Sequence, residues 1–146
     1  MMRLDGGCAC GEIRFAVEIG PEAKTDFCHC RACRKASGAP VTAWLQVAPG
    51  AFHLRAGRPQ SHVSSPRGRR FFCGTCGSPL YMTDPDDISV GVMAGALDDP
   101  GSLRPSGHGW CREALAWLKI DDGLPRHEGD PPWDDAGGLS APSEGT

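Results

Sequence analysis

The sequence predicts a mostly β domain built of many short strands, with few helical turns. The chain has 20 glycines and 13 prolines among 146 residues, a composition that favours turns over long helices. Apolar and polar residues alternate over residues 12–19, where Ile13, Phe15, Val17 and Ile19 share one face. Alternation of this kind is the pattern of a half-buried strand. No long segment repeats its apolar residues with a helical period.

Residues 12–19 are the first expected strand. Six further short segments are rich in strand-forming residues or bounded by Gly, Pro or Asp, and we expect strands at 41–47, 51–55, 61–65, 69–73, 79–83 and 87–93. Residues 85–87, Pro-Asp-Asp, predict a turn. A helix of one or two turns is expected over 31–38, ending at Gly38. Residues 111–118 are ambiguous, with a helix as one interpretation.

The composition changes near residue 121, where Asp, Gly and Pro become frequent and apolar residues rare. A chain of this length corresponds to a single domain. We therefore expect one zinc-binding domain over 1–128. The acidic Gly/Pro-rich tail, 129–146, is expected to be disordered, because it cannot bury enough apolar surface to offset its ordering entropy.

The net charge and the targeting signals of the sequence limit which classes of partner and which compartment it favours. The net charge is −3, which does not favour nucleic acid or a membrane surface. A basic run is spread over several segments without interleaved aromatics, so it is a weak nucleic-acid signal; its members are Arg55, Arg58, Arg67, Arg69 and Arg70. We find no signal peptide and no apolar run long enough to span a bilayer. These features predict the cytoplasm, where eight reduced cysteines are better explained as metal ligands than as disulfides.

The cysteines fall into clusters with metal-ligand spacing. Cys73 and Cys76 form a Cys-x-x-Cys-Gly knuckle, in which Gly74 and Gly77 can accept the positive φ of a tight turn. Cys8 and Cys10 form a Cys-x-Cys pair whose side chains project to one face of an extended chain. Each pair supplies half of the ligands that a closed zinc site needs.

Two other functions use similar cysteine pairs. A thioredoxin-like redox pair needs a helix beginning at its first cysteine, but Gly77, Ser78 and Pro79 follow the knuckle at once. A zinc deaminase has a ligand-x-Glu element that Cys10-Gly11-Glu12 imitates. Its Cys-x-x-Cys is preceded by Pro, whereas Phe72 stands here. Neither alternative accounts for the other cysteines.

Cys28, Cys30 and Cys33 lie within six residues and offer three thiolates. A metal held by three protein ligands keeps one position open, as catalytic zinc sites do. Three thiolates leave zinc with a charge of about −1 and donate strongly, so a thiol is a better fourth partner than a water destined for hydrolysis. The alternative is that Cys111 closes this site, which would make the protein a non-catalytic zinc-stabilised binding module with two closed sites.

Five segments occur in an order that resembles the glutathione-dependent formaldehyde-activating enzyme family, which includes the centromere protein V domain. They are GGCACGEIRF, CHCRACRKASG, RRFFCGTCGSPLY, ALDDPGSLRP and AWLKIDDGLP, and they cover roughly residues 4–125. The resemblance implies a β-tent fold of short antiparallel strands stabilised by zinc. One departure is Cys111, which stands where the family usually has an apolar residue.

The resemblance also implies the ligand pairing and the activity. A structural zinc would be held by Cys8, Cys10, Cys73 and Cys76, and a catalytic zinc by Cys28, Cys30 and Cys33, giving two Zn²⁺ per chain. The implied enzyme is a carbon–sulfur lyase resembling S-(hydroxymethyl)glutathione synthase. Its partners would be a small-molecule thiol, with glutathione as co-substrate, and an aldehyde such as formaldehyde.

Basic and imidazole side chains near the three cysteines are candidates for substrate contacts. Arg31 is the preferred candidate for a substrate carboxylate, because guanidinium groups pair with carboxylates; Arg34 and Lys35 are also explained as an exposed helical face. His29 lies between two expected ligands and is expected to point away from the metal. His108 is a candidate for a role in the pocket.

Overall fold

The computed structural model describes residues 2–66, 68–86 and 88–131, and these residues form ten short strands and one short helix. The prediction of a mostly β protein is therefore confirmed. The strands are β1 Met2–Gly7, β2 Arg14–Ile19, β3 Lys24–Cys28, β4 Thr42–Val47, β5 Phe52–Ala56, β6 Gln60–Ser65, β7 Gly68–Phe72, β8 Pro79–Thr83, β9 Val90–Met93 and β10 His108–Gly109. The helix is α1, Arg31–Ser37, and four 3-10 turns are η1 Pro49–Ala51, η2 Ala94–Ala96, η3 Pro100–Ser102 and η4 Cys111–Glu113.

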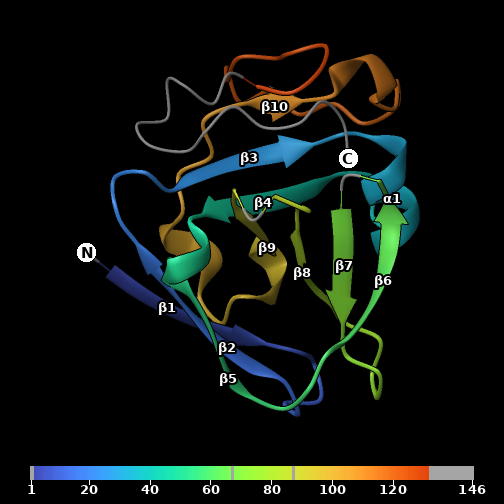
Figure 1. Cartoon of the computed structure of the whole chain (residues 1–146). Helices are drawn as coiled ribbons and strands as arrows, with labels where there is room; N and C mark the ends of the chain where they lie inside the picture. The colour runs from blue at the N-terminus through green and yellow to red at the C-terminus, as the bar shows by residue number, and fades with distance from the viewer. Residues whose placement is uncertain (1, 67, 87, 132–146) are drawn as a thin grey trace.

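Two sheets organise these strands (Figure 1). The smaller sheet has the order β1-β2-β5, and the larger has the order β10-β3-β4-β9-β8-β7-β6. All pairs are antiparallel except β10 with β3. Antiparallel strands are what the family resemblance implies, and the parallel pair joins residues about 80 positions apart.

The main core lies where the apolar face of β2 meets the larger sheet. Phe15 and Val17 of β2 are buried, as the alternation predicts, and pack with Leu45 of β4 and Val92 of β9. A second, smaller cluster contains Cys28, Cys30, Cys33 and Trp44. Its strand residues are Cys28 of β3 and Trp44 of β4. Adjacent residues of a strand point to opposite faces of the sheet, so Trp44 points away from the face that carries Leu45.

The single helix follows the prediction at both ends. Cys30 caps its N-terminus, and Gly38 follows its last residue with φ 77°, where its backbone N–H donates to the Arg34 carbonyl at 2.8 Å. Glycine adopts this left-handed conformation without a steric cost. The helical interpretation of 111–118 is wrong beyond the single turn η4. Among the described residues, no helix is long and apolar enough to cross a membrane.

Three strands were not predicted, and each lacks a strong apolar pattern. β1 is mostly exposed, β3 contains one large apolar side chain in five residues, and β10 has only two residues. Backbone pairing stabilises β3 instead, because it lies between β10 and β4. Pairing with a distant strand is not encoded in local alternation.

The segment after β10 lies over β3 (Figure 1). The Trp110 backbone N–H donates to the Gly129 carbonyl at 2.9 Å, and its indole N–H donates to Asp130 Oδ1 at 2.7 Å. The domain boundary at residue 128 stays a prediction, although Gly129 and Asp130 contact the domain. Within the expected tail, 132–146 lie outside the described residues.

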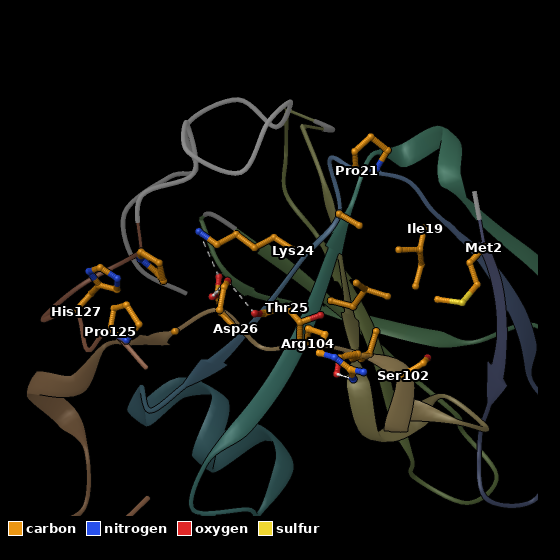
Figure 2. A pocket seen from close by; sticks show the side chains of 16 residues that line it. Met2, Ile19, Pro21, Lys24, Thr25, Asp26, Ser102, Arg104, Pro125 and His127 are labelled. Atoms are coloured by element: carbon orange, nitrogen blue, oxygen red, sulfur yellow. Dashed lines mark hydrogen bonds and ion pairs between the residues drawn. The ribbon is translucent and has the colours of Figure 1, made fainter. Parts of the chain in front are cut away.

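Asp26 of β3 is a buried carboxylate beside a pocket of about 670 Å³ (Figure 2). Its Oδ1 accepts a hydrogen bond from the Ser106 hydroxyl at 3.0 Å, while its Oδ2 has no hydrogen-bond partner among the described residues and lies 3.9 Å from the Lys24 ammonium. Burial raises the pKa of Asp26 above its usual value, and the charge of Lys24 offsets part of that effect. The ionised carboxylate is therefore a cost to the fold.

Asp26→Asn is expected to raise the melting temperature at pH 8 by about 2–5 °C. The folded chain binds a proton at Asp26 more tightly than the unfolded chain does. The favourable contribution of this carboxyl is therefore complete below its unfolded pKa and is lost as pH rises through the raised folded pKa. The advantage of the variant should shrink as the pH falls towards 4, which calorimetry over a pH series can measure.

Asp99→Asn, which changes an exposed carboxylate, is the matched control and should show no such pH-dependent difference. A melting temperature of Asp26→Asn below that of the unaltered chain at every pH would mean that the attraction to Lys24 exceeds the desolvation cost.

Candidate metal centres and the pocket beside them

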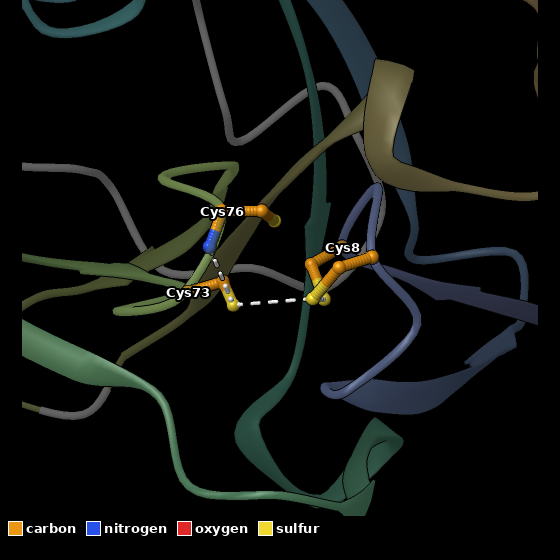
Figure 3. A group of neighbouring side chains, drawn as sticks. Cys8, Cys73 and Cys76 are labelled. Carbon is orange, nitrogen blue, oxygen red and sulfur yellow. Dashed lines mark hydrogen bonds between the residues drawn. The ribbon is translucent and has the colours of Figure 1, made fainter.

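Four cysteine sulfurs from two distant segments meet in one group. Cys8 and Cys10 follow β1, Cys73 follows β7 directly, and Cys76 lies in the turn before β8 (Figure 3). All four Sγ atoms lie within 4.8 Å of one another, with Cys8 and Cys10 at 3.5 Å and Cys10 and Cys73 at 3.8 Å. This group joins the end of the smaller sheet to a turn of the larger one.

The backbone around these four sulfurs turns as metal ligands require. Gly77 has φ 80°, and its N–H donates to the Cys73 carbonyl at 2.8 Å. The prediction of a positive φ is right for Gly77 and wrong for Gly74, where a side chain would collide with the Gln60 amide. Gly11, with φ 83°, makes the matching turn after Cys10. Positive φ explains glycine at positions 11 and 77, whereas the Gln60 amide beside Gly74 ends a flexible, exposed side chain that can move aside.

Polar contacts also join the two segments. The Thr75 hydroxyl donates to Glu12 Oε2 at 2.9 Å, and the Ala9 backbone N–H donates to the Ser78 hydroxyl at 3.0 Å. Glu12 therefore links the N-terminal loop to the knuckle.

The other three clustered cysteines form a second group. Cys28 ends β3, Cys30 is the N-cap of α1, and Cys33 lies in the first helical turn. Their Sγ atoms also lie within 4.8 Å of one another, and all three residues are buried. Cys30 has extended backbone angles, so residues 28 and 30 face the same side, and the helical turn brings Cys33 to meet them.

Both groups fit a zinc ion. Zn–S bonds of about 2.3 Å in a tetrahedron place sulfurs roughly 3.7–3.8 Å apart, close to the separations among Cys8, Cys10 and Cys73. Backbone N–H groups also point at sulfurs, as they do where thiolates are held. Ile13 N donates to Cys8 Sγ at 3.2 Å, Cys33 N to Cys30 Sγ at 3.2 Å and Cys76 N to Cys73 Sγ at 3.5 Å. The two groups could thus hold metal, one with four sulfurs and one with three.

The three-cysteine group favours negative charge on Cys33. Hydrogen bonds with Cys28 and Cys30, and then the charge of Arg70, lower the pKa of Cys33 to about 2. Hydrogen bonds with Cys30 and Cys33 raise the pKa of Cys28. Without a cation at the site, one thiolate in this buried group therefore makes ionisation of a second thiol less favourable.

Arg70 of β7 contacts one of these sulfurs. Its Nη2 donates to Cys33 Sγ at 3.6 Å, and its guanidinium carbon lies 5.9 Å from the ring centroid of Trp44. Only 8% of Arg70 is exposed, whereas its neighbour Arg69 is exposed and donates to the Ser61 hydroxyl. The sequence analysis named Arg70 only within the dispersed basic run. Alternation along β7 could have separated it from Arg69 but not shown which of the two points inward.

A pocket of about 590 Å³ opens beside Cys33 and Arg70. Aromatic and apolar side chains form much of its wall, including Trp44, Phe71 and Tyr81. Its lining contains Arg70 and Lys35 but no Asp or Glu among the described residues. Pockets of this size accommodate small molecules.

A chain of buried imidazoles runs from the same loop to the surface. His29 Nε2 lies 2.8 Å from His108 Nδ1, and His108 Nε2 lies 2.8 Å from Asp122 Oδ2. A carboxylate accepts hydrogen bonds, so with neutral rings His108 donates to Asp122 and His29 donates to His108. Burial lowers the pKa of His29, whose Nδ1 has no hydrogen-bond partner among the described residues. His108 was a candidate for a role in the pocket, but neither imidazole is among the described residues that line it.

Cys111 lies outside both sulfur groups. Its thiol contacts the His108 carbonyl oxygen at 3.7 Å, and it is not among the described residues that gather around Cys28, Cys30 and Cys33. Trp110, with φ 57°, instead packs its side chain against the three-cysteine cluster. The geometry thus offers no support for a closed site completed by Cys111.

The basic residues of α1 are distributed unequally. Arg31 is exposed and does not line the pocket; its backbone N–H donates to Glu113 Oε1 at 2.8 Å. Lys35 lines the pocket, and Arg34 does not. The basic run suspected of binding nucleic acid does not form one exposed face, because Arg70 points inward while Arg55 and Arg58 are exposed.

Fold and site together define a small β protein with two cysteine groups suited to metal, one of which opens into a pocket. The family model described as glutathione-dependent formaldehyde-activating enzyme matches residues 3–113. The chain belongs to this family, so the resemblance in its sequence is confirmed.

One relative supports the assignment, and one solved structure resembles the fold. A Halomonas elongata protein named "Putative glutathione-dependent formaldehyde-activating enzyme" is 32% identical over 129 residues, which cover 82% of each chain. A crystal structure of a Rhodobacter sphaeroides protein matches with a TM-score of 0.51 at 18% identity, covering 84% of this chain and 99% of the other. The second match concerns the fold alone.

Proposed function

We propose that this protein is a zinc-dependent carbon–sulfur lyase that forms and cleaves the adduct of a thiol with an aldehyde, with S-(hydroxymethyl)glutathione as that adduct. Family membership supports the thiol and the aldehyde, because the family and the Halomonas elongata relative are named for glutathione and formaldehyde. The observation that carries the proposal is a group of three buried sulfurs, one short of a closed site, whose Cys33 lines a pocket.

The residues have separate roles in this proposal. Cys28, Cys30 and Cys33 hold the catalytic zinc, and Cys8, Cys10, Cys73 and Cys76 hold a structural zinc. When bound, the catalytic zinc would supply an open position that takes a thiol in its nucleophilic thiolate form. The apolar pocket walls exclude water from the reacting groups, and Arg70 balances the negative charge of the sulfurs.

The reaction itself balances without an oxidant or reductant. The substrate sulfur forms a bond to the carbonyl carbon while the C=O π bond breaks, and its electron pair moves to oxygen. The proton that the thiol gives up ends on the new hydroxyl group. In the reverse direction the hydroxyl loses its proton and the carbon–sulfur bond breaks.

Native mass spectrometry at neutral pH is expected to find two zinc ions per chain. The same preparation should speed the exchange between formaldehyde and S-(hydroxymethyl)glutathione above the uncatalysed rate, as followed by NMR. A strong chelator should remove both metals and the rate increase, because protein thiolates alone do not present an open metal position.

Returning zinc to the chelated protein is the control and should restore both readouts. One tightly bound zinc, or an exchange rate equal to that in buffer, would contradict the proposal. Two zinc ions without any rate increase would instead favour the non-catalytic binding module.

A further inference from the structure

The guanidinium of Arg70 has more N–H donors than its contacts with the described residues use. A buried guanidinium carries a large desolvation cost unless its charge and its N–H groups are matched. Among the described residues, the structure gives it one hydrogen bond, to Cys33 Sγ, and one ring contact, to Trp44. No carboxylate among the described residues forms an ion pair with Arg70, and Arg70 lines the pocket.

Among the described residues, the charged Arg and Lys side chains that line the pocket have no acidic counterpart there. Lys35 lines the same pocket, and no acidic side chain does so among the described residues. A cavity with two cations, aromatic walls and no carboxylate attracts an anion and disfavours a cation. The guanidinium N–H groups not used by Cys33 suit a carboxylate, which can accept two of them at once.

We propose that Arg70, assisted by Lys35, makes this pocket selective for thiols that carry a carboxylate. This specificity rests on the proposed function for the thiol but is a separate property of the pocket. Arg70 then bridges two negative groups: the sulfur of Cys33 on one side and the substrate carboxylate on the other. The residue proposed to bind the substrate carboxylate is thus Arg70 of β7 and no longer Arg31, which is exposed and lies outside the pocket.

Binding of S-methylglutathione tests this selectivity without thiolate coordination or turnover, because its sulfur is blocked. Its diethyl ester, which lacks both carboxylate charges, is the matched ligand. The zinc-loaded protein should bind the acid at least about 10-fold more tightly than the ester in calorimetry, since a charged hydrogen bond is worth about 1.5–3 kcal/mol. Tryptophan fluorescence offers a second readout, because Trp44 lies under Arg70.

Arg70→Gln should weaken binding of the acid about 10-fold and bring acid and ester close to equality. Arg69→Gln is the control: it removes an arginine one residue away that is exposed and outside the pocket. It should bind both ligands as the unaltered chain does. Lys35→Gln, at an exposed position, should reduce the preference for the acid by a smaller factor of about 2–3, as expected for an exposed charge.

Equal binding of acid and ester by the unaltered protein would overturn the proposal, whether or not Arg70→Gln folds. A preference that survives in a folded Arg70→Gln chain with two metals would also overturn it. The two ideas can fail separately. Exchange with glutathione but no acid preference refutes the role of Arg70, while acid preference without exchange refutes the proposed function and leaves the anion pocket.

Discussion

Cys76→Ser is expected to unfold or aggregate the domain, with a fall in melting temperature of more than about 10 °C. Cys76 is exposed, so the substitution removes a metal ligand without opening a cavity in the core. Its sulfur belongs to the group that joins the loop after β1 to the turn between β7 and β8. Metal affinity at such a site contributes directly to the free energy of folding.

The size of the effect follows from comparing free energies. Structural zinc sites bind with about 10–16 kcal/mol of apparent free energy, whereas a domain has a net stability of about 5–15 kcal/mol. Losing even part of this binding energy is therefore enough to depopulate the folded state. Circular dichroism during heating, with zinc content measured on the same sample, checks the expectation.

Cys111→Ser is the control, since it changes a cysteine outside both sulfur groups. Its melting temperature should move by no more than a few degrees, and it should keep both zinc ions. A Cys76→Ser chain that retains two metals and its melting temperature would show that the four-sulfur group is not a structural metal site.

Cys30→Ser is expected to stay folded, to bind about one zinc fewer, and to lose adduct exchange by at least about 100-fold. Serine is nearly isosteric and is itself a preferred helix N-cap. Its hydroxyl can accept the hydrogen bond that Cys30 Sγ accepts from the Cys33 backbone N–H. The three ligands lie within six residues, so losing their metal releases little long-range structure.

The measurements are circular dichroism, native mass spectrometry and NMR exchange between formaldehyde and S-(hydroxymethyl)glutathione, with the uncatalysed rate subtracted. Cys111→Ser, outside both sulfur groups and the pocket, controls for a general effect of replacing a cysteine by serine and should keep its exchange rate within about a factor of two. If Cys30→Ser unfolds as severely as Cys76→Ser, the three-cysteine group is structural and the enzyme proposal fails.

Most of the strands and the three-cysteine group could be predicted from the sequence, because each depends on short-range rules. Alternation placed β2 and β4, and Gly38 marked the end of α1. Spacing grouped Cys28, Cys30 and Cys33, since an extended residue pair followed by a helical turn directs all three to one side. The pairing of Cys8 and Cys10 with Cys73 and Cys76 was implied by family resemblance, and spacing alone left it open.

The partners of Arg70, His29 and Cys111 depended on the tertiary structure. Arg70 reaches Cys33 because β7 and α1 border the same pocket, although 37 residues separate them. His29 meets His108 because β10 pairs in parallel with β3 across about 80 residues of chain. Strand order and register decide such contacts, and local periodicity records only that one face of a strand is buried. The sequence by itself therefore determined which sulfurs can share a metal locally, and only the folded sheets decided which cation, imidazole and pocket stand beside them.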